Sequence, residues 1–129
     1  MKLFVVDDSS VIRKVIRAAA DMLQMETEEA QGGIEALQKL SQVFAEIDLI
    51  LLDWNMPDMS GYDVLVEIKS NEKYRNIPVM MVTTEGQQSN IIAAVRAGAD
   101  NYLVKPFTVE EMESKIIECL GKGGDFDGD

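Results

Sequence analysis

The chain has 129 residues, of which 47% are hydrophobic and 27% are charged, as expected for one globular domain with a hydrophobic core. Its formal net charge of −11 argues against nucleic-acid binding, which needs a basic surface, and no apolar run reaches the roughly 18 residues of a membrane span. The absence of histidine excludes histidine-ligated zinc and the catalytic sites in which a histidine acts as the base.

The first half of the chain alternates short apolar runs with helical periodicity. A strand is predicted at residues 4–6, followed by a helix that Ser9 or Ser10 would cap. A weaker strand is predicted at Glu26–Ala30. The apolar residues at helical spacing are, in the first helix, Val11, Ile12, Val15, Ile16, Ala19, Met22 and Leu23 and, in the second, Ile34, Leu37, Leu40 and Phe44.

The second half continues the same alternation. Strands are predicted at 47–52, at Ile77–Val82 and at 101–104, and each is followed by a helix. Gly98 is placed to end the fourth helix, because glycine adopts the left-handed conformation found just after many helices. The apolar residues that mark the three helices are Val64, Leu65 and Ile68, then Ile91, Ile92 and Val95, and finally Val109, Met112, Ile116 and Leu120.

Continuous rather than alternating apolar strands indicate burial on both faces, as in a parallel sheet covered by helices. Five strand–helix units in this length predict a three-layer doubly wound α/β fold, whose commonest five-strand order is 2-1-3-4-5, the flavodoxin-like arrangement. Residues 1–120 are expected to form this domain and residues 121–129 a flexible acidic tail. The single cysteine, Cys119, cannot form an internal disulfide, and its helical spacing favours a buried structural thiol in a cytoplasmic protein.

Polar residues follow four of the predicted strands. Asp7 and Asp8 come after the first strand, Asp53 after the third, Thr83 after the fourth and Lys105 after the fifth. The carboxyl ends of parallel strands meet at one edge of a sheet, so these groups are expected to share one pocket.

Three carboxylates in one pocket repel one another, which either raises their pKa values or recruits a cation. Hard oxygen ligands in a water-accessible site suit Mg²⁺, with Mn²⁺ as the alternative. Asp53 is the best nucleophile candidate, because carboxylates form covalent phosphoryl intermediates. The metal, Lys105 and Thr83 would each contact a phosphoryl oxygen.

Each group alone also has a plainer interpretation. Asp7 or Asp8 could cap the following helix, the Thr83 hydroxyl could satisfy a turn, and Lys105 could be a solvated charge at the end of a strand. The combination is more specific than any single member.

Four segments, in the same order and spacing, carry a resemblance to response-regulator receiver domains over residues 2–120. They are Val5-Val6-Asp7-Asp8-Ser9, the stretch from Asp53 to Gly61, Val82-Thr83 and Lys105-Pro106-Phe107. The resemblance implies a stand-alone, chemotaxis-type phospho-acceptor switch that acts through protein–protein contacts. It would catalyse its own phosphorylation and dephosphorylation and would not be a conventional enzyme. Its phosphoryl donor would be a histidine kinase.

The resemblance also assigns roles to single residues. Asp53 would be phosphorylated, and Mg²⁺ would be bound by Asp8, by Asp53 and by the backbone carbonyl of Asn55, with Asp7 acting through a water. Lys105 would pair with the phosphoryl group and precede a cis peptide bond to Pro106.

Further positions concern switching and output. Thr83 and Tyr102 match the switch pair of the family, and Asn55 and Glu85 resemble chemotaxis-type choices that tune hydrolysis of the acyl phosphate. Ile91, Val95 and Tyr102 are either a partner-facing surface or, for the two aliphatic residues, core. The implied partners are a flagellar-motor switch protein or another effector, and a phosphatase.

Other interpretations stay open from the sequence. The chain could be a phosphorelay intermediate or a receiver domain from a larger regulator. A small flavoprotein needs a Ser/Thr/Gly-rich phosphate loop where this chain has Asp7-Asp8. An aspartate-dependent phosphatase needs Asp-x-Asp after the first strand, whereas here the two aspartates are adjacent.

Overall fold

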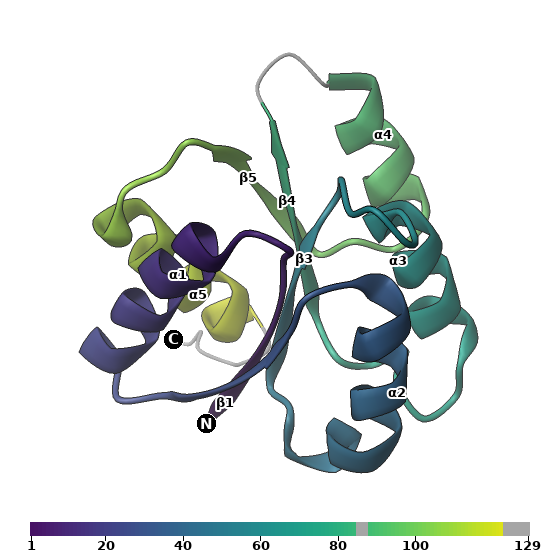
Figure 1. Ribbon diagram of the computed structural model, residues 1–129, viewed down its shortest axis with the longest axis horizontal. Coiled ribbons are helices and arrows are strands. Elements are labelled where there is room, and N and C mark those ends of the chain that lie inside the picture. The colour runs from purple at the N-terminus through teal and green to yellow at the C-terminus, as the bar shows by residue number, and fades with distance from the viewer. Residues whose placement is uncertain (85–87, 123–129) are drawn as a thin grey trace.

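A computed structural model describes residues 1–84 and 88–122. Within this part of the chain, five parallel strands form one sheet in the order β2-β1-β3-β4-β5, which confirms the predicted doubly wound fold (Figure 1). The strands are β1 (Lys2–Val6), β2 (Glu26–Ala30), β3 (Leu49–Asp53), β4 (Val79–Thr84) and β5 (Asn101–Lys105). The helices are α1 (Ser10–Met22), α2 (Gly33–Val43), α3 (Gly61–Ser70), α4 (Gln88–Arg96) and α5 (Val109–Lys122), with a short 3₁₀ turn at Phe44–Glu46.

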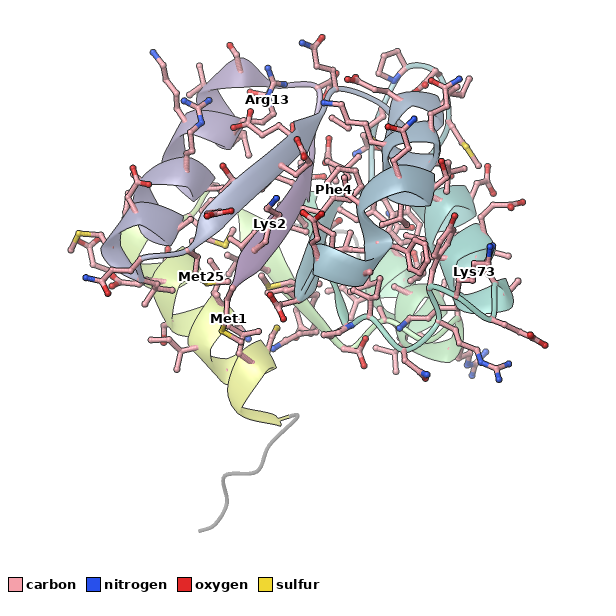
Figure 2. The ribbon with its side chains drawn as sticks, turned by 90° about the horizontal axis from the view of Figure 1, so that it is seen from below. Met1, Lys2, Phe4, Arg13, Met25 and Lys73 are labelled. Carbon is pink, nitrogen blue, oxygen red and sulfur yellow. The ribbon has the colours of Figure 1, made fainter. Side chains whose placement is uncertain are left out.

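The helices cover both faces of the sheet. Helices α1 and α5 lie on one face and α2, α3 and α4 on the other (Figure 1). Alternate residues of β1 and β3 therefore enter two separate cores: Phe4 packs on the α2 side and Leu3 on the α1 and α5 side, where Met25, just before β2, also packs. Figure 2 shows Phe4 between the sheet and α2, with Met25 on the opposite side.

The central strand explains where the functional groups gather. All five residues of β3 are buried, and it pairs with β1 on one side and β4 on the other. The strands run upward in Figure 1, so the ends of β1, β3, β4 and β5 reach the same edge of the sheet.

Side-chain caps fix the starts of three helices. The Ser9 hydroxyl accepts a hydrogen bond from the N–H of Ile12, and that of Ser60 accepts one from Asp63, at 3.2 and 3.1 Å. Thr108 and Glu111 exchange two hydrogen bonds in a capping box at the start of α5. The prediction that Ser9 or Ser10 caps the first helix is confirmed for Ser9.

The fourth strand differs from its predicted boundaries. Ile77 donates its N–H to the carbonyl of Tyr74, in a turn, and Pro78 has no N–H to give to a sheet. The strand therefore starts at Val79 and runs two residues further than predicted, so that Thr83 lies within it. Gly98 has φ of +108° just after α4, as predicted, and Cys119 is buried.

No helix in residues 1–84 and 88–122 is long and apolar enough to cross a bilayer. Helix α5 continues to Lys122, two residues beyond the predicted domain end. Most of the predicted acidic tail, like Glu85, lies outside the described residues.

Candidate functional site

The three predicted carboxylates meet at the end of β1 and β3. Asp7 and Asp53 are buried and Asp8 is exposed, and one oxygen from each lies within 4.8 Å of the others. Asp7 also makes a local contact, because its Oδ1 accepts a hydrogen bond from the N–H of Ser9 at 2.9 Å. Neither aspartate is the helix cap, because Ser9 occupies that position.

Lys105 places its ammonium between two of these carboxylates. Its Nζ lies 3.1 Å from Oδ2 of Asp7 and 3.2 Å from Oδ1 of Asp53. The lysine side chain is 19% exposed, so the interpretation as a solvated charge is wrong. The peptide bond from Lys105 to Pro106 is cis, as the resemblance implied.

The charges of the pocket do not balance among the described residues. Three carboxylates and one ammonium leave two negative charges when all are ionised. Burial, and then the neighbouring Asp7, raise the pKa of Asp53 to about 6, although Lys105 and the N–H of Asn55 act in the opposite direction. Burial lowers the pKa of Lys105, but Asp53 and Asp7 together raise it above its ordinary value. The pocket therefore favours an added cation or a proton.

The Thr83 hydroxyl is buried and has no hydrogen-bond partner among the described residues. A buried hydroxyl left in this state costs about 1–3 kcal/mol, which argues against the interpretation that it satisfies a turn. Strand register pairs Met81 with Tyr102 and Thr83 with Val104. Since residues two apart share a face of a strand, Thr83 and Tyr102 lie on the same face of the sheet.

Residues around the pocket have different exposures. Asn55 is exposed in the loop after β3, and Trp54 is half-buried, with its ring centroid 5.6 Å from that of Tyr62. Tyr102 is 38% exposed, and the Nζ of Lys115 lies 5.6 Å from its ring centroid.

The outer face of α4 is more apolar than the sequence suggested. Val95 is 57% exposed, so the core interpretation is wrong for this residue, whereas Ile91 is half-buried. Ile92, at 55% exposed, belongs to the same surface. Among residues 89–96, the buried residue of the helix is the small Ala94.

Sequence reasoning did not identify Arg13, which holds the backbone of the Asp7 loop in place. Its Nη1 donates to the backbone carbonyl of Asp7 at 2.7 Å, and its Nε donates to Glu29 on β2 at 3.0 Å. Figure 2 places Arg13 on α1, next to the edge strand. The only available signal was its position in the first turn of the predicted helix, five residues after Asp8, where an arginine could reach back to the loop.

We expect Arg13→Lys to lower the free energy of unfolding by about 1–2 kcal/mol, because lysine cannot bind the carbonyl and Glu29 with one planar group. Urea unfolding measures this loss. The control is Arg17→Lys, because Arg17 also binds Glu29 but is 44% exposed, and it should change stability by less than about 0.5 kcal/mol. Equal stability of Arg13→Lys and wild type would contradict the supporting role.

Comparisons with known proteins agree with this geometry. The chain matches the family model for the response regulator receiver domain over residues 3–117. Chemotaxis protein CheY1 of Helicobacter pylori is 42% identical over 122 residues, which are 94% of this chain and 98% of that protein. The structure of chemotaxis protein CheY4 of Vibrio cholerae has a TM-score of 0.84 at 33% identity, covering 92% of this chain and 98% of that one. The phosphorylated cyanobacterial phytochrome response regulator RcpA has a TM-score of 0.83 at 27% identity, covering 95% and 96%. This chain therefore belongs to the response regulator receiver domain family and is similar to CheY chemotaxis proteins.

Proposed function

We propose that this chain is a cytoplasmic, stand-alone chemotaxis-type switch in which Asp53 accepts a phosphoryl group from a histidine kinase. The observation that carries this proposal is the position of the Lys105 ammonium, between Asp53 and Asp7 in a cluster of three carboxylates. A buried carboxylate next to a fixed cation and an acidic cluster suits phosphoryl transfer better than a purely structural ion pair.

Mg²⁺ fits the donor set of the pocket. The excess of two negative charges matches one divalent cation, and the ligand atoms are hard oxygens. We assign Asp8, Asp53 and the carbonyl of Asn55 as direct ligands. Asp7 would act through a water, because its Oδ1 accepts a hydrogen bond from Ser9 and its Oδ2 forms an ion pair with Lys105. The bound metal would neutralise charge on the phosphoryl oxygens, and Mn²⁺ could replace it.

The protein groups would act as follows during transfer. A carboxylate oxygen of Asp53 forms the new O–P bond while the P–N bond of the donor phosphohistidine breaks, and the electron pair of that bond stays on the histidine. Lys105 would move its ammonium from the ionised Asp53 to the incoming phosphoryl group, which it is close enough to reach. Thr83 would gain a hydrogen-bond partner, which its hydroxyl lacks among the described residues.

The switch would connect this bond to the surface of α4. A shift of Thr83 toward the phosphoryl group opens space on the face that it shares with Tyr102, and the half-exposed ring can turn into that space. The apolar residues Ile91, Ile92 and Val95 lie on the neighbouring helix and would form the effector-binding surface with Tyr102. A flagellar-motor switch protein is the proposed effector, since the Helicobacter and Vibrio relatives are chemotaxis proteins.

Dephosphorylation would depend on groups at the mouth of the pocket. Asn55 is exposed there and is proposed to tune water access, together with Glu85 and a partner phosphatase.

The test is phosphorylation by acetyl phosphate with and without Mg²⁺. Wild type should form an acyl phosphate only with Mg²⁺, seen as a shifted band on a phosphate-affinity gel and as a change in Trp54 fluorescence. Asp53→Ala should show no shifted band, because no carboxylate oxygen is left to accept the group. The control is Asp21→Ala, which removes an exposed carboxylate on α1 and should behave as wild type. A shifted band in Asp53→Ala would refute the assignment of Asp53.

A further inference from the structure

Helix α2 begins without a cap of its own. Gly32 occupies the cap position and Gly33 the first helical position, and neither has a side chain that could accept hydrogen bonds from the first N–H groups. These groups point away from the helix and need an acceptor.

The acceptor comes from the loop after β3, 25 residues further along the chain. Oδ1 of Asp58 accepts a hydrogen bond from the N–H of Gly33 at 3.1 Å, and Oδ2 accepts one from Ile34 at 3.0 Å. The hydrogen bonds from Ile34 and Gly33 hold the pKa of Asp58 below its ordinary value. Asp58 therefore joins the loop to α2 with both of its oxygens.

Both sides of this contact are shaped for close approach. A Cβ at Gly32 would lie 2.8 Å from Oδ1 of Asp58, and one at Gly33 would lie 2.9 Å from the Cβ of Met59. The carboxylate occupies the space in which a serine or threonine at position 32 would form its own cap. The two glycines therefore leave the space in which Asp58 caps α2.

The same loop contains Trp54 and Asn55 of the proposed site. It is held at its ends by backbone hydrogen bonds, from Trp54 to the carbonyl of Val82 and from Gly61 to the carbonyl of Trp54, at 3.0 and 2.7 Å. Asp58 lies between these points and is the loop residue whose side chain bonds to a different helix.

We infer that Asp58 is a positioning residue for the Mg²⁺ site: by joining the loop to the N-terminus of α2, it holds the carbonyl of Asn55 in the place where a metal ligand is needed. This inference rests on the proposed function, because it assumes that Asn55 binds the metal. Asp58 itself does not belong to the carboxylate cluster and would act only through the backbone of the loop.

Three variants separate loop positioning from helix capping. Asp58→Ala removes both the cap of α2 and the link between α2 and the loop. Asp58→Ala combined with Gly32→Ser gives α2 a new cap, because the three atoms nearest to a Cβ at Gly32 all belong to the Asp58 carboxylate. Asp63→Asn removes one exposed charge five residues later in the chain and controls for electrostatic attraction of the metal.

Mg²⁺ affinity is measured by titration of Trp54 fluorescence, and stability by the urea midpoint. Asp58→Ala should weaken Mg²⁺ binding about tenfold, as is usual for groups that orient a ligand, and should lower the urea midpoint. The double variant should recover the midpoint but not the affinity. Asp63→Asn should stay within about twofold of wild type.

The outcomes are distinguishable. If wild type binds Mg²⁺ and Asp58→Ala binds it equally well, the inference is overturned and the proposed function is not. If the double variant recovers both affinity and midpoint, Asp58 only caps α2, and the inference is also overturned. A wild-type chain that binds no Mg²⁺ overturns this inference together with the proposed metal site.

Discussion

Asp53→Asn is expected to be more stable than the wild type by about 1–3 kcal/mol at pH 8 without divalent metal. Asp53 is buried next to Asp7, and these two causes raise its pKa to about 6 from an ordinary value of 3.8. At pH 8 the folded wild type must therefore hold a charge that its surroundings disfavour. An asparagine of the same shape removes that charge and can still accept a hydrogen bond from Lys105.

The raised pKa of Asp53 also predicts how the stability of the wild type changes with pH. The folded state binds the proton of Asp53 more tightly than the unfolded state, so the free energy of unfolding falls as the pH rises. The contribution is fully present below about pH 4 and is lost as the pH rises through about 6. The difference between Asp53→Asn and wild type should thus be near zero at pH 4 and reach its limit above pH 6.

Urea unfolding of both proteins from pH 4 to pH 8 measures the difference in their free energies of unfolding. Contributions from the other carboxylates are present in both proteins and cancel in this difference. Asp58→Asn is the control and should instead destabilise the protein at pH 8. Hydrogen bonds from Ile34 and Gly33 lower the pKa of Asp58, so its ionised form stabilises the folded state. Saturating Mg²⁺ should stabilise wild type more than Asp53→Asn. If Asp53→Asn is no more stable than wild type at pH 8, Lys105 already compensates for the charge of Asp53, and the prediction is wrong.

This cost has a functional explanation within the proposed role. If lysines fully neutralised the charge of Asp53, the pocket would have little affinity for a divalent metal, and phosphorylation would need that metal. The uncompensated charge around Asp53 and the Thr83 hydroxyl, which has no partner in residues 1–84 and 88–122, both lower the stability of the unmodified protein. Metal binding and phosphorylation would each relieve one of these costs, so the same features favour the switched state.

The sheet and the pocket were predictable from the sequence because both follow from the direction of the strands. Apolar runs place β1, β3, β4 and β5, and parallel pairing then brings Asp7, Asp53, Thr83 and Lys105 to one edge. The start of β4 was predicted two residues early, because Ile77 is apolar but donates its N–H within a turn, and Pro78 accepts a hydrogen bond from Ile50 but has no N–H to donate to the sheet. Hydrophobicity does not distinguish a buried turn from the first residues of a strand.

Contacts between distant loops and helices were not predictable in the same way. The hydrogen bond from Arg13 to the carbonyl of Asp7 depends on how the loop after β1 turns. The hydrogen bonds to Asp58 depend on how the loop after β3 meets the start of α2. A pair of glycines at the start of α2 was the one sequence sign that a cap comes from elsewhere. On α4, periodicity could not show that Ala94 faces the core while Ile92 and Val95 face outward.

Gly61→Ala is expected to lower the free energy of unfolding by more than about 3 kcal/mol, although alanine usually stabilises a helix by about 0.5–1 kcal/mol over glycine. Gly61 is the first residue of α3, and a Cβ there would overlap the carbonyl oxygen of Asp53 and lie 2.9 Å from the Cα of Trp54. Both are backbone atoms, which no side-chain rotation can move away. Relief of the clash must displace the end of β3 or the start of α3.

Displacement of β3 would also move Asp53 itself, so Gly61→Ala should weaken Mg²⁺ binding and slow phosphorylation along with its loss of stability. Urea unfolding and Trp54 fluorescence report the two effects in one sample. The control is Ser60→Ala, which loses the cap to Asp63 one residue earlier, without a clash, and should cost about 1 kcal/mol. If Gly61→Ala were no less stable than Ser60→Ala, the close approach of α3 to the backbone of Asp53 would not constrain this position. The glycine would then be dispensable for the geometry of the acceptor site.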